Sequence, residues 1–268
     1  MENNQSVFSN FTEYELRLLK QCKAKTNPDE SIYSHSYKCY NLSAKILEKF
    51  FISKSVIECE KIKIEPYIIK DICAFHVLLH DLGKSDIRFQ NKMDGKIKFS
   101  PPHALLSLEK AKEKLTERIK KYDIAEEQKK LLKSISLLSI ASHHSDYHRD
   151  LYKKNDSEPS YKILKESVDY LDEIKFPNYH LPSEIKFLYT FFNGVLRMSD
   201  WISSGNLETK NLFFENQTEL SERTKSYLKF KNFALYEHQK YFKTNFNCGF
   251  MRLPTGDGKT ETSLLANF

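Results

Sequence analysis

The chain has 268 residues, of which 40% are apolar, so it is long enough for one large domain or for one domain and the beginning of another. Lysine and arginine number 42 against 36 aspartate and glutamate residues, and the net charge of +6 permits a polyanionic partner without requiring one. The five cysteines are widely spaced and form no CxxC pair, which argues against a disulfide framework and against a thiolate zinc site.

The apolar runs are short for a membrane protein. None approaches the roughly 20 residues that a spanning helix needs, and the N-terminus lacks the basic-then-apolar order of a signal peptide. We therefore expect a cytoplasmic, monomeric protein without a membrane partner.

Up to Trp201 the apolar residues recur mostly with the period of an α-helix, which predicts a mainly α domain. Glycine and proline predict loops at 91–102 and 152–160. After Trp201 a polar connector, residues 206–230, precedes a segment, 231–268, with a turn-strand-loop-helix pattern. The predicted helices are 13–23, 35–53, 67–82, 103–122, 125–143, 161–173 and 184–203.

The stretch DICAFHVLLHDLGK ends an apolar helix with His80 and Asp81. At about 100° per residue the two side chains point to adjacent sectors of the helix, so they could bind neighbouring metal ions, and a bridging carboxylate suits Asp81. Lys84 lies one turn beyond Asp81, close enough to meet the carboxylate or a phosphate, although it could equally be a surface lysine. The dipeptide alone is explained equally well by a buried histidine that hydrogen-bonds its surroundings.

Further candidates lie on predicted helices or at their ends. His143 and His144 follow the apolar run LLSIAS, and Asp200 follows an apolar helix face that would carry its carboxylate inward. Burying an unpaired carboxylate is unfavourable, and metal ligation removes that cost. His35 and His103 complete the set of candidate ligands.

In the order H…HD…H…HH…D these residues resemble the ligands of the HD-superfamily metal-dependent phosphohydrolases. HDLGK, the histidine before a helix at 103, the HH pair and LRMSDWISS are similar to the HD nuclease domain of the CRISPR-associated helicase-nuclease of type I systems, over about residues 30–205. The resemblance implies an HD-domain helical bundle within residues 1–205. It also implies one metal ion among His35, His80, Asp81 and Asp200, with Asp81 bridging to a second ion at His103, His143 and His144.

Imidazole and carboxylate ligands together favour two transition-metal ions, Mn, Fe, Co, Ni or Zn. His76 shares a helix face with His80 but lies outside the family pattern, so we interpret it as a core residue or a support for the site. His148, His180 and His238 are interpreted as surface or structural residues.

The stretch RLPTGDGKTETSLL has glycines where a backbone can approach phosphate, followed by a lysine and a threonine suited to phosphate and Mg²⁺. Leu253 replaces the first glycine of GxxxxGK[ST], but TGxGKT resembles the first motif of superfamily 2 helicases, and LYEHQKYF resembles their adenine-reading element. Residues 231–268 therefore resemble the truncated beginning of a RecA-like α/β helicase domain, which implies ATP and Mg²⁺ in a longer form of the protein. The matching positions are Gln239, Thr255, Gly256, Gly258, Lys259 and Thr260.

Together these likenesses imply a metal-dependent nuclease that degrades single-stranded DNA in type I CRISPR interference, with Asp81 and Lys84 as catalytic residues. A Cascade-type surveillance complex would be the partner of the full-length protein. Two alternatives remain open: an HD phosphohydrolase that acts on nucleotides or nucleotide second messengers through the same cluster, and a catalytically inactive HD docking module.

Overall fold

The structure is a computed structural model that describes residues 7–27, 29–50, 64–144, 159–173 and 183–205, with residues 225, 226, 229, 230 and 234. Contacts divide the chain into two compact units, Met1–Leu207 and Glu208–Phe268. The residues of the predicted phosphate loop and Gln239 lie outside the described residues, as does most of the predicted loop at 152–160.

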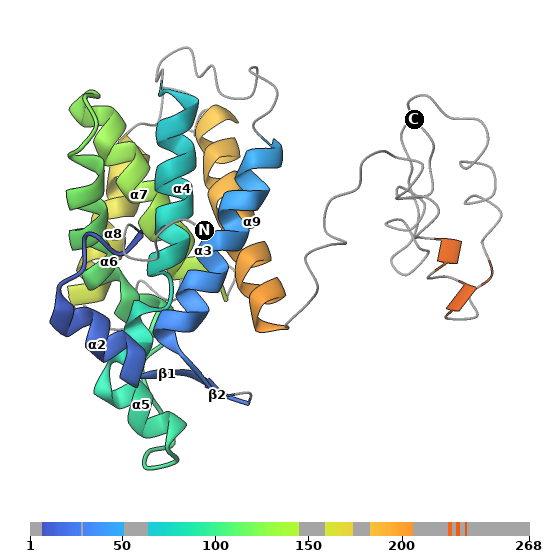
Figure 1. The fold of residues 1–268 in the computed structure, drawn as a ribbon. Coiled ribbons are helices and arrows are strands. Elements are labelled where there is room, and N and C mark those ends of the chain that lie inside the picture. The colour runs from blue at the N-terminus through green and yellow to red at the C-terminus, as the bar shows by residue number, and fades with distance from the viewer. Residues whose placement is uncertain are drawn as a thin grey trace. The chain divides into compact units, whose positions relative to one another are not determined.

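The first unit is a helical bundle in its described part (Figure 1). In the described residues, no helix is both long and apolar enough to cross a bilayer. The helices are α2 (Glu13–Gln21), α3 (Ile32–Phe50), α4 (Pro66–Leu79), α5 (Ile87–Met93), α6 (His103–Ile119), α7 (Glu126–Ser142), α8 (Pro159–Glu173) and α9 (Ser183–Ser204).

Helix α4 forms the centre of the bundle. It packs against α3, α6, α7 and α9, and its side chains from Ile68 through Leu79, apart from Lys70 and Asp71, are buried. A helix that is apolar on nearly every side is stable only when neighbours cover it completely. The last turn of α4 therefore delivers the residues that follow it into the interior.

The seven predicted helices are confirmed, with shifted ends. The prediction for 67–82 is wrong at its C-terminal end, because α4 stops at Leu79 and a short 3₁₀ helix, η1 (Leu82–Ser85), follows. The predicted helix 35–53 begins earlier, at Ile32, and residues 51–53 lie outside the described residues.

A β-hairpin and a short helix were also not predicted. An antiparallel hairpin joins β1 (Lys23–Thr26) to β2 (Asp29–Ser31). Helix α5 occupies the start of the stretch predicted as a loop at 91–102; it begins after Asp86, whose side chain accepts a 2.8 Å hydrogen bond from the backbone N–H of Arg88. Figure 1 places α5 and the hairpin near each other at one end of the bundle, where Gln90 Oε1 accepts from the backbone N–H of Lys23 at 3.1 Å.

Candidate metal centre

The His80-Asp81 turn lies at the end of α4, where the backbone leaves the α-helical path. His80 caps the helix in a helical conformation, and Asp81 adopts φ −103° and ψ 8° before η1 begins. The Lys84 N–H donates to the Asp81 carbonyl at 2.9 Å, a three-residue bond typical of a 3₁₀ turn. The turn thus replaces the regular helical geometry expected for this pair.

Close packing against α6 holds this turn in place. A Cβ on Gly83 would meet the His103 carbonyl oxygen at 2.1 Å, so only glycine fits there. The Ser107 hydroxyl lies 2.6 Å from the His80 carbonyl and 2.9 Å from that of His103, and it accepts from the Gly83 N–H at 2.8 Å. Gly83 and Ser107 therefore fix the position of His80 relative to His103.

The first group of candidate ligands comes from α3, α4 and α9. His35 Nε2 lies 3.1 Å from Asp200 Oδ1, and His80 Nε2 lies 3.8 Å from the same oxygen. One ligand atom from each of these side chains, and the sulfur of Cys39, lie within 4.8 Å of one another. All four residues are buried, although His35 and Asp200 are 165 positions apart in the sequence.

The second group contains Asp81, His103, His143 and His144, whose ligand atoms also lie within 4.8 Å of one another. His103 Nε2 is 3.0 Å from His144 Nε2. Residues 143 and 144 stand at the end of α7, where the His143 ring nitrogen Nδ1 lies 2.6 Å from the Ile140 carbonyl. This bond to the preceding turn directs the other nitrogen, Nε2, away from the helix.

Asp81 faces both groups. Its Oδ2 lies 3.4 Å from the Nε2 atoms of His35 and His80, whereas its Oδ1 lies 3.3 Å from His103 Nε2. Lys84 Nζ is 2.8 Å from Oδ2. The structure thus brings all seven sequence-predicted candidate ligands, and Lys84, into one cluster with a carboxylate at its centre.

Several buried donor atoms in this cluster have no hydrogen-bond partner among the described residues. They include His80 Nε2 and His143 Nε2. Buried polar groups are normally paired, and a divalent cation accepts electron pairs from these atom types. The donor set therefore fits one or two transition-metal ions.

The protonation states agree with this fit for Asp81, His143 and His144, whereas the carboxylates of Asp81 and Asp200 outweigh burial and raise the pKa of His80, so His80 must lose a proton when it binds a metal. Although burial alone would raise the pKa of Asp81, the positive charges of His80 and Lys84 hold it well below its usual range. Burial and the charge of His80 hold the pKa of His143 well below its ordinary value, and burial also lowers the pKa of His144. Anionic carboxylates and neutral imidazoles are the forms that bind metals.

Glu30 of β2 supports His35 from the side away from the cluster. Its Oε2 lies 3.6 Å from His35 Nδ1, and its carboxylate pairs with Lys25 at 2.8 Å and with Lys38 at 2.6 Å. Burial alone would raise the pKa of Glu30, but the two lysines lower it to about 2. A carboxylate beside the remote ring nitrogen orients a ligating histidine and increases its basicity.

The interpretation of His76 as a core residue is confirmed. His76 is fully buried, its ring lies 5.0 Å from that of Phe192, and burial lowers its pKa to about 3. Among the described residues it belongs to neither group of candidate ligands. His148, His180 and His238 lie outside the described residues.

Cys39 is the residue that sequence reasoning missed. The absence of a CxxC pair argued against a thiolate zinc site, yet Cys39 lies one helical turn after His35 on α3, with its sulfur 3.6 Å from His35 Nε2. The usable signal was the i, i+4 spacing of HxxxC, which places both side chains on one helix face.

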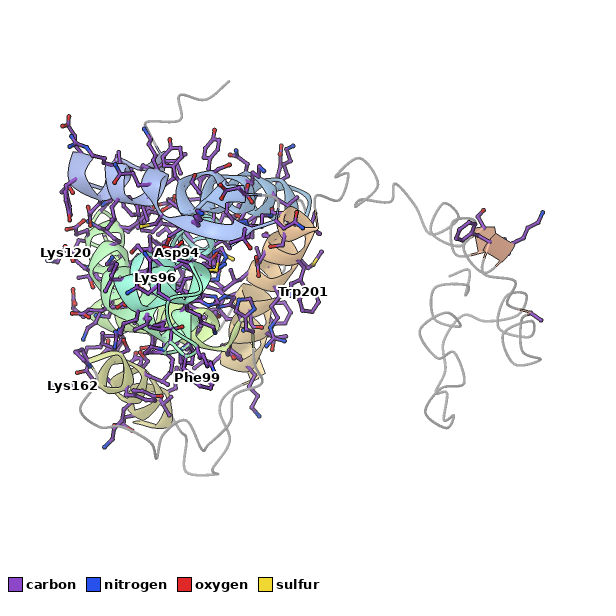
Figure 2. The ribbon with its side chains drawn as sticks, turned by 90° about the horizontal axis from the view of Figure 1, so that it is seen from below. Asp94, Lys96, Phe99, Lys120, Lys162 and Trp201 are labelled. Atoms are coloured by element: carbon purple, nitrogen blue, oxygen red, sulfur yellow. The ribbon has the colours of Figure 1, made fainter. Side chains whose placement is uncertain are left out.

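The cluster opens to solvent on the side of the second group. His144 is exposed, and the side chains of His103 and Lys84 are 16% and 13% accessible. Neighbouring side chains on α9 differ in exposure. Asp200 is buried, whereas the next residue, Trp201, is 62% exposed and points away from the bundle in Figure 2. Among the described residues the second group is therefore the more accessible of the two.

Comparison with known proteins adds one finding. The family model described as Cas3, HD domain, matches residues 22–207, which include every candidate ligand. No match was found among curated proteins or among solved structures.

Proposed function

Because this chain belongs to the family of Cas3 HD domains, metal-dependent nucleases of CRISPR systems, we propose that it degrades single-stranded DNA in type I CRISPR interference. The observation that carries the proposal is the pair of donor groups on either side of Asp81, in which His80 Nε2 and His143 Nε2 are buried and have no hydrogen-bond partner among the described residues. A phosphodiester is the substrate class that such a centre suits best.

We assign His35, His80, Asp81 and Asp200 to one ion and Asp81, His103, His143 and His144 to a second. When bound, divalent ions at such a site supply Lewis-acid stabilisation of phosphate charge and activation of a water nucleophile. The chain's own part is to hold seven ligands on five packed elements and to exclude bulk water from the side of His35 and Asp200, both of which are buried.

Lys84 is the residue placed to meet the substrate. Its ammonium group lies 2.8 Å from Asp81 and retains some solvent access, so it can exchange a carboxylate contact for a phosphate oxygen. Through this contact Lys84 orients the scissile phosphate beside Asp81. We therefore retain Asp81 and Lys84 as the catalytic residues.

The C-terminal residues support the choice of DNA as substrate. The TGxGKT segment, with Gln239 upstream, is the basis for proposing the start of a superfamily 2 helicase at residues 231–268, which would bind ATP and Mg²⁺ in a longer protein. Such a motor would supply unwound strands to the nuclease, and a Cascade-type complex would recruit it. For the given chain we expect cleavage of single strands without ATP.

The test compares single-stranded DNA, duplex DNA, RNA and free nucleotides as substrates of the purified chain, after chelation and after addition of Mn²⁺, Co²⁺ or Ni²⁺. We expect metal-dependent cleavage of single-stranded DNA, loss of cleavage in Asp200→Asn, and retention in Asp94→Asn. Asp94 is a matched control because its carboxylate pairs with Lys96 at 3.0 Å on an exposed surface, visible in Figure 2.

Each other outcome has a defined meaning. Preferential hydrolysis of nucleotides would favour the alternative phosphohydrolase, and bound metal without hydrolysis of any substrate would favour the docking module. Cleavage that persists after exhaustive chelation would exclude the metal mechanism altogether.

A further inference from the structure

We propose that Cys39 is an additional ligand of the ion assigned to His35, His80, Asp81 and Asp200, and that it gives this position a preference for thiophilic divalent ions such as Zn²⁺ and Cd²⁺. The inference rests on the proposed metal centre but concerns a residue outside the H…HD…H…HH…D pattern. It predicts which metals the first position selects.

The first support is geometric. The Cys39 sulfur and ligand atoms of the other three residues lie within 4.8 Å of one another. For bonds of about 2.3 Å from an ion to sulfur and about 2.05 Å to nitrogen that meet at an angle of about 109°, those two donors are separated by about 3.6 Å. The observed distance from Cys39 Sγ to His35 Nε2 is also 3.6 Å.

The second support is independent of the cysteine. His80 is fully buried, and its Nε2 has no hydrogen-bond partner in the described part of the chain, although it lies within the same group of ligand atoms as the sulfur. His80 Nδ1 is occupied by the Val77 carbonyl at 2.7 Å, so Nε2 is the nitrogen directed into the group. A buried imidazole nitrogen without a hydrogen bond, in one group of ligand atoms with a thiol and a carboxylate, is a donor arrangement that suits zinc.

Ligation requires the thiol to lose its proton. Formation of the sulfur–metal bond breaks the S–H bond and releases one proton to the buffer, since a coordinating cation deprotonates a thiol.

The two groups of candidate ligands differ in donor type, and this difference predicts different metal preferences. Among the described residues the second group contains only imidazole and carboxylate donors, whereas the first contains a sulfur as well. Thiolate favours zinc-like ions, and carboxylate and imidazole accept manganese-like ions more readily. We therefore expect the two positions to differ in metal preference, with thiophilic ions retained at the first.

Titration of the metal-free 268-residue chain with Co²⁺ tests the proposal without measuring activity. We expect a sulfur-to-cobalt charge-transfer absorption in the near ultraviolet for the wild type. Cys39→Ser and Cys39→Ala should both lose this absorption while keeping the visible bands of cobalt bound to nitrogen and oxygen. Cys73→Ala is the matched control, because Cys73 is equally buried on α4 but belongs to neither candidate ligand group.

A second measurement compares affinities. Replacing Cys39 by alanine should weaken Cd²⁺ binding at least about tenfold and Mn²⁺ binding by less than about threefold. If the visible cobalt bands are present, a charge-transfer band that is absent from the wild type would overturn the ligand role of Cys39 but not the metal centre. A band that is unchanged in both Cys39 variants would have the same meaning. Absence of all cobalt absorption in the wild type would overturn the proposed metal centre as well.

Discussion

Replacement of Asp81 by asparagine is the perturbation that tests the centre most directly. The substitution preserves size and one carbonyl oxygen, but it removes the negative charge and turns the second oxygen into an N–H donor. In the structure the two oxygens of Asp81 face different groups, at 3.4 Å from His35 Nε2 and 3.3 Å from His103 Nε2. Asparagine can therefore serve one ion but cannot bridge two.

The size of the effect follows from burial. Asp81 has no accessible surface, and removing one partner of a buried charged cluster costs about 3 to 5 kcal/mol. At about 1.4 kcal/mol per tenfold change, this corresponds to a loss of about 100- to 3,000-fold in binding of the second ion. The exposed His144 touches one group only, so His144→Ala should weaken binding by about 10- to 100-fold.

The assay measures bound metal by elemental analysis together with single-strand cleavage across a metal titration. Excess metal should restore cleavage to His144→Ala, because that variant has an affinity defect, but should not restore it to Asp81→Asn. Asp94→Asn controls for loss of a carboxylate at the surface, and thermal unfolding of the metal-free proteins controls for folding. If Asp81→Asn retained two ions and near-normal cleavage, the bridging role would be refuted.

Gly83→Ala should destabilise the protein by about 1 to 3 kcal/mol in denaturant unfolding, because its Cβ would overlap the α6 backbone. Gly194→Ala is the control, because Gly194 lies within α9 with open space around it, and this substitution should stabilise the protein by about 0.5 to 1 kcal/mol. Equal effects of the two substitutions would contradict the close packing at Gly83. Ser107→Ala should cost about 1 to 3 kcal/mol in the same measurement, because it leaves the buried Gly83 N–H without its acceptor. For Glu30, whose pKa falls from 4.5 unfolded to about 2 folded, the contribution to stability should be complete above pH 4.5 and disappear as the pH falls toward 2. The difference in unfolding free energy between wild type and Glu30→Gln should accordingly shrink from pH 7 to pH 3, and a constant difference would reject the lysine pairing.

The long helices could be predicted because their apolar faces are broad and their period is regular. The clustering of the candidate ligands could be predicted because each lies at or near the end of such a helix or on its buried face, in the order of the HD-superfamily resemblance. The hairpin was missed since strands of four and three residues are too short to display an alternating pattern, and α5, with seven residues, spans barely two turns.

The local error at His80-Asp81 has a tertiary cause. Gly83 lies against the backbone of His103, twenty positions away in the sequence. The residues next to Gly83 do not predict this contact, because it depends on how α6 packs against the turn after α4. Cys39 was missed for a different reason. A rule for paired cysteines was applied to a residue whose partner is a histidine one turn earlier.

The dispersion of the candidate ligands along the chain has a consequence for synthesis. His35 is made early, whereas Asp200, which lies 3.1 Å from it in the folded protein, is made 165 residues later. A nascent chain that ends before α9 carries all the imidazoles of the centre but lacks the second carboxylate. The complete set of candidate ligands therefore exists only after α9 has been translated and docked, so an unfinished chain on the ribosome cannot yet assemble the candidate metal centre.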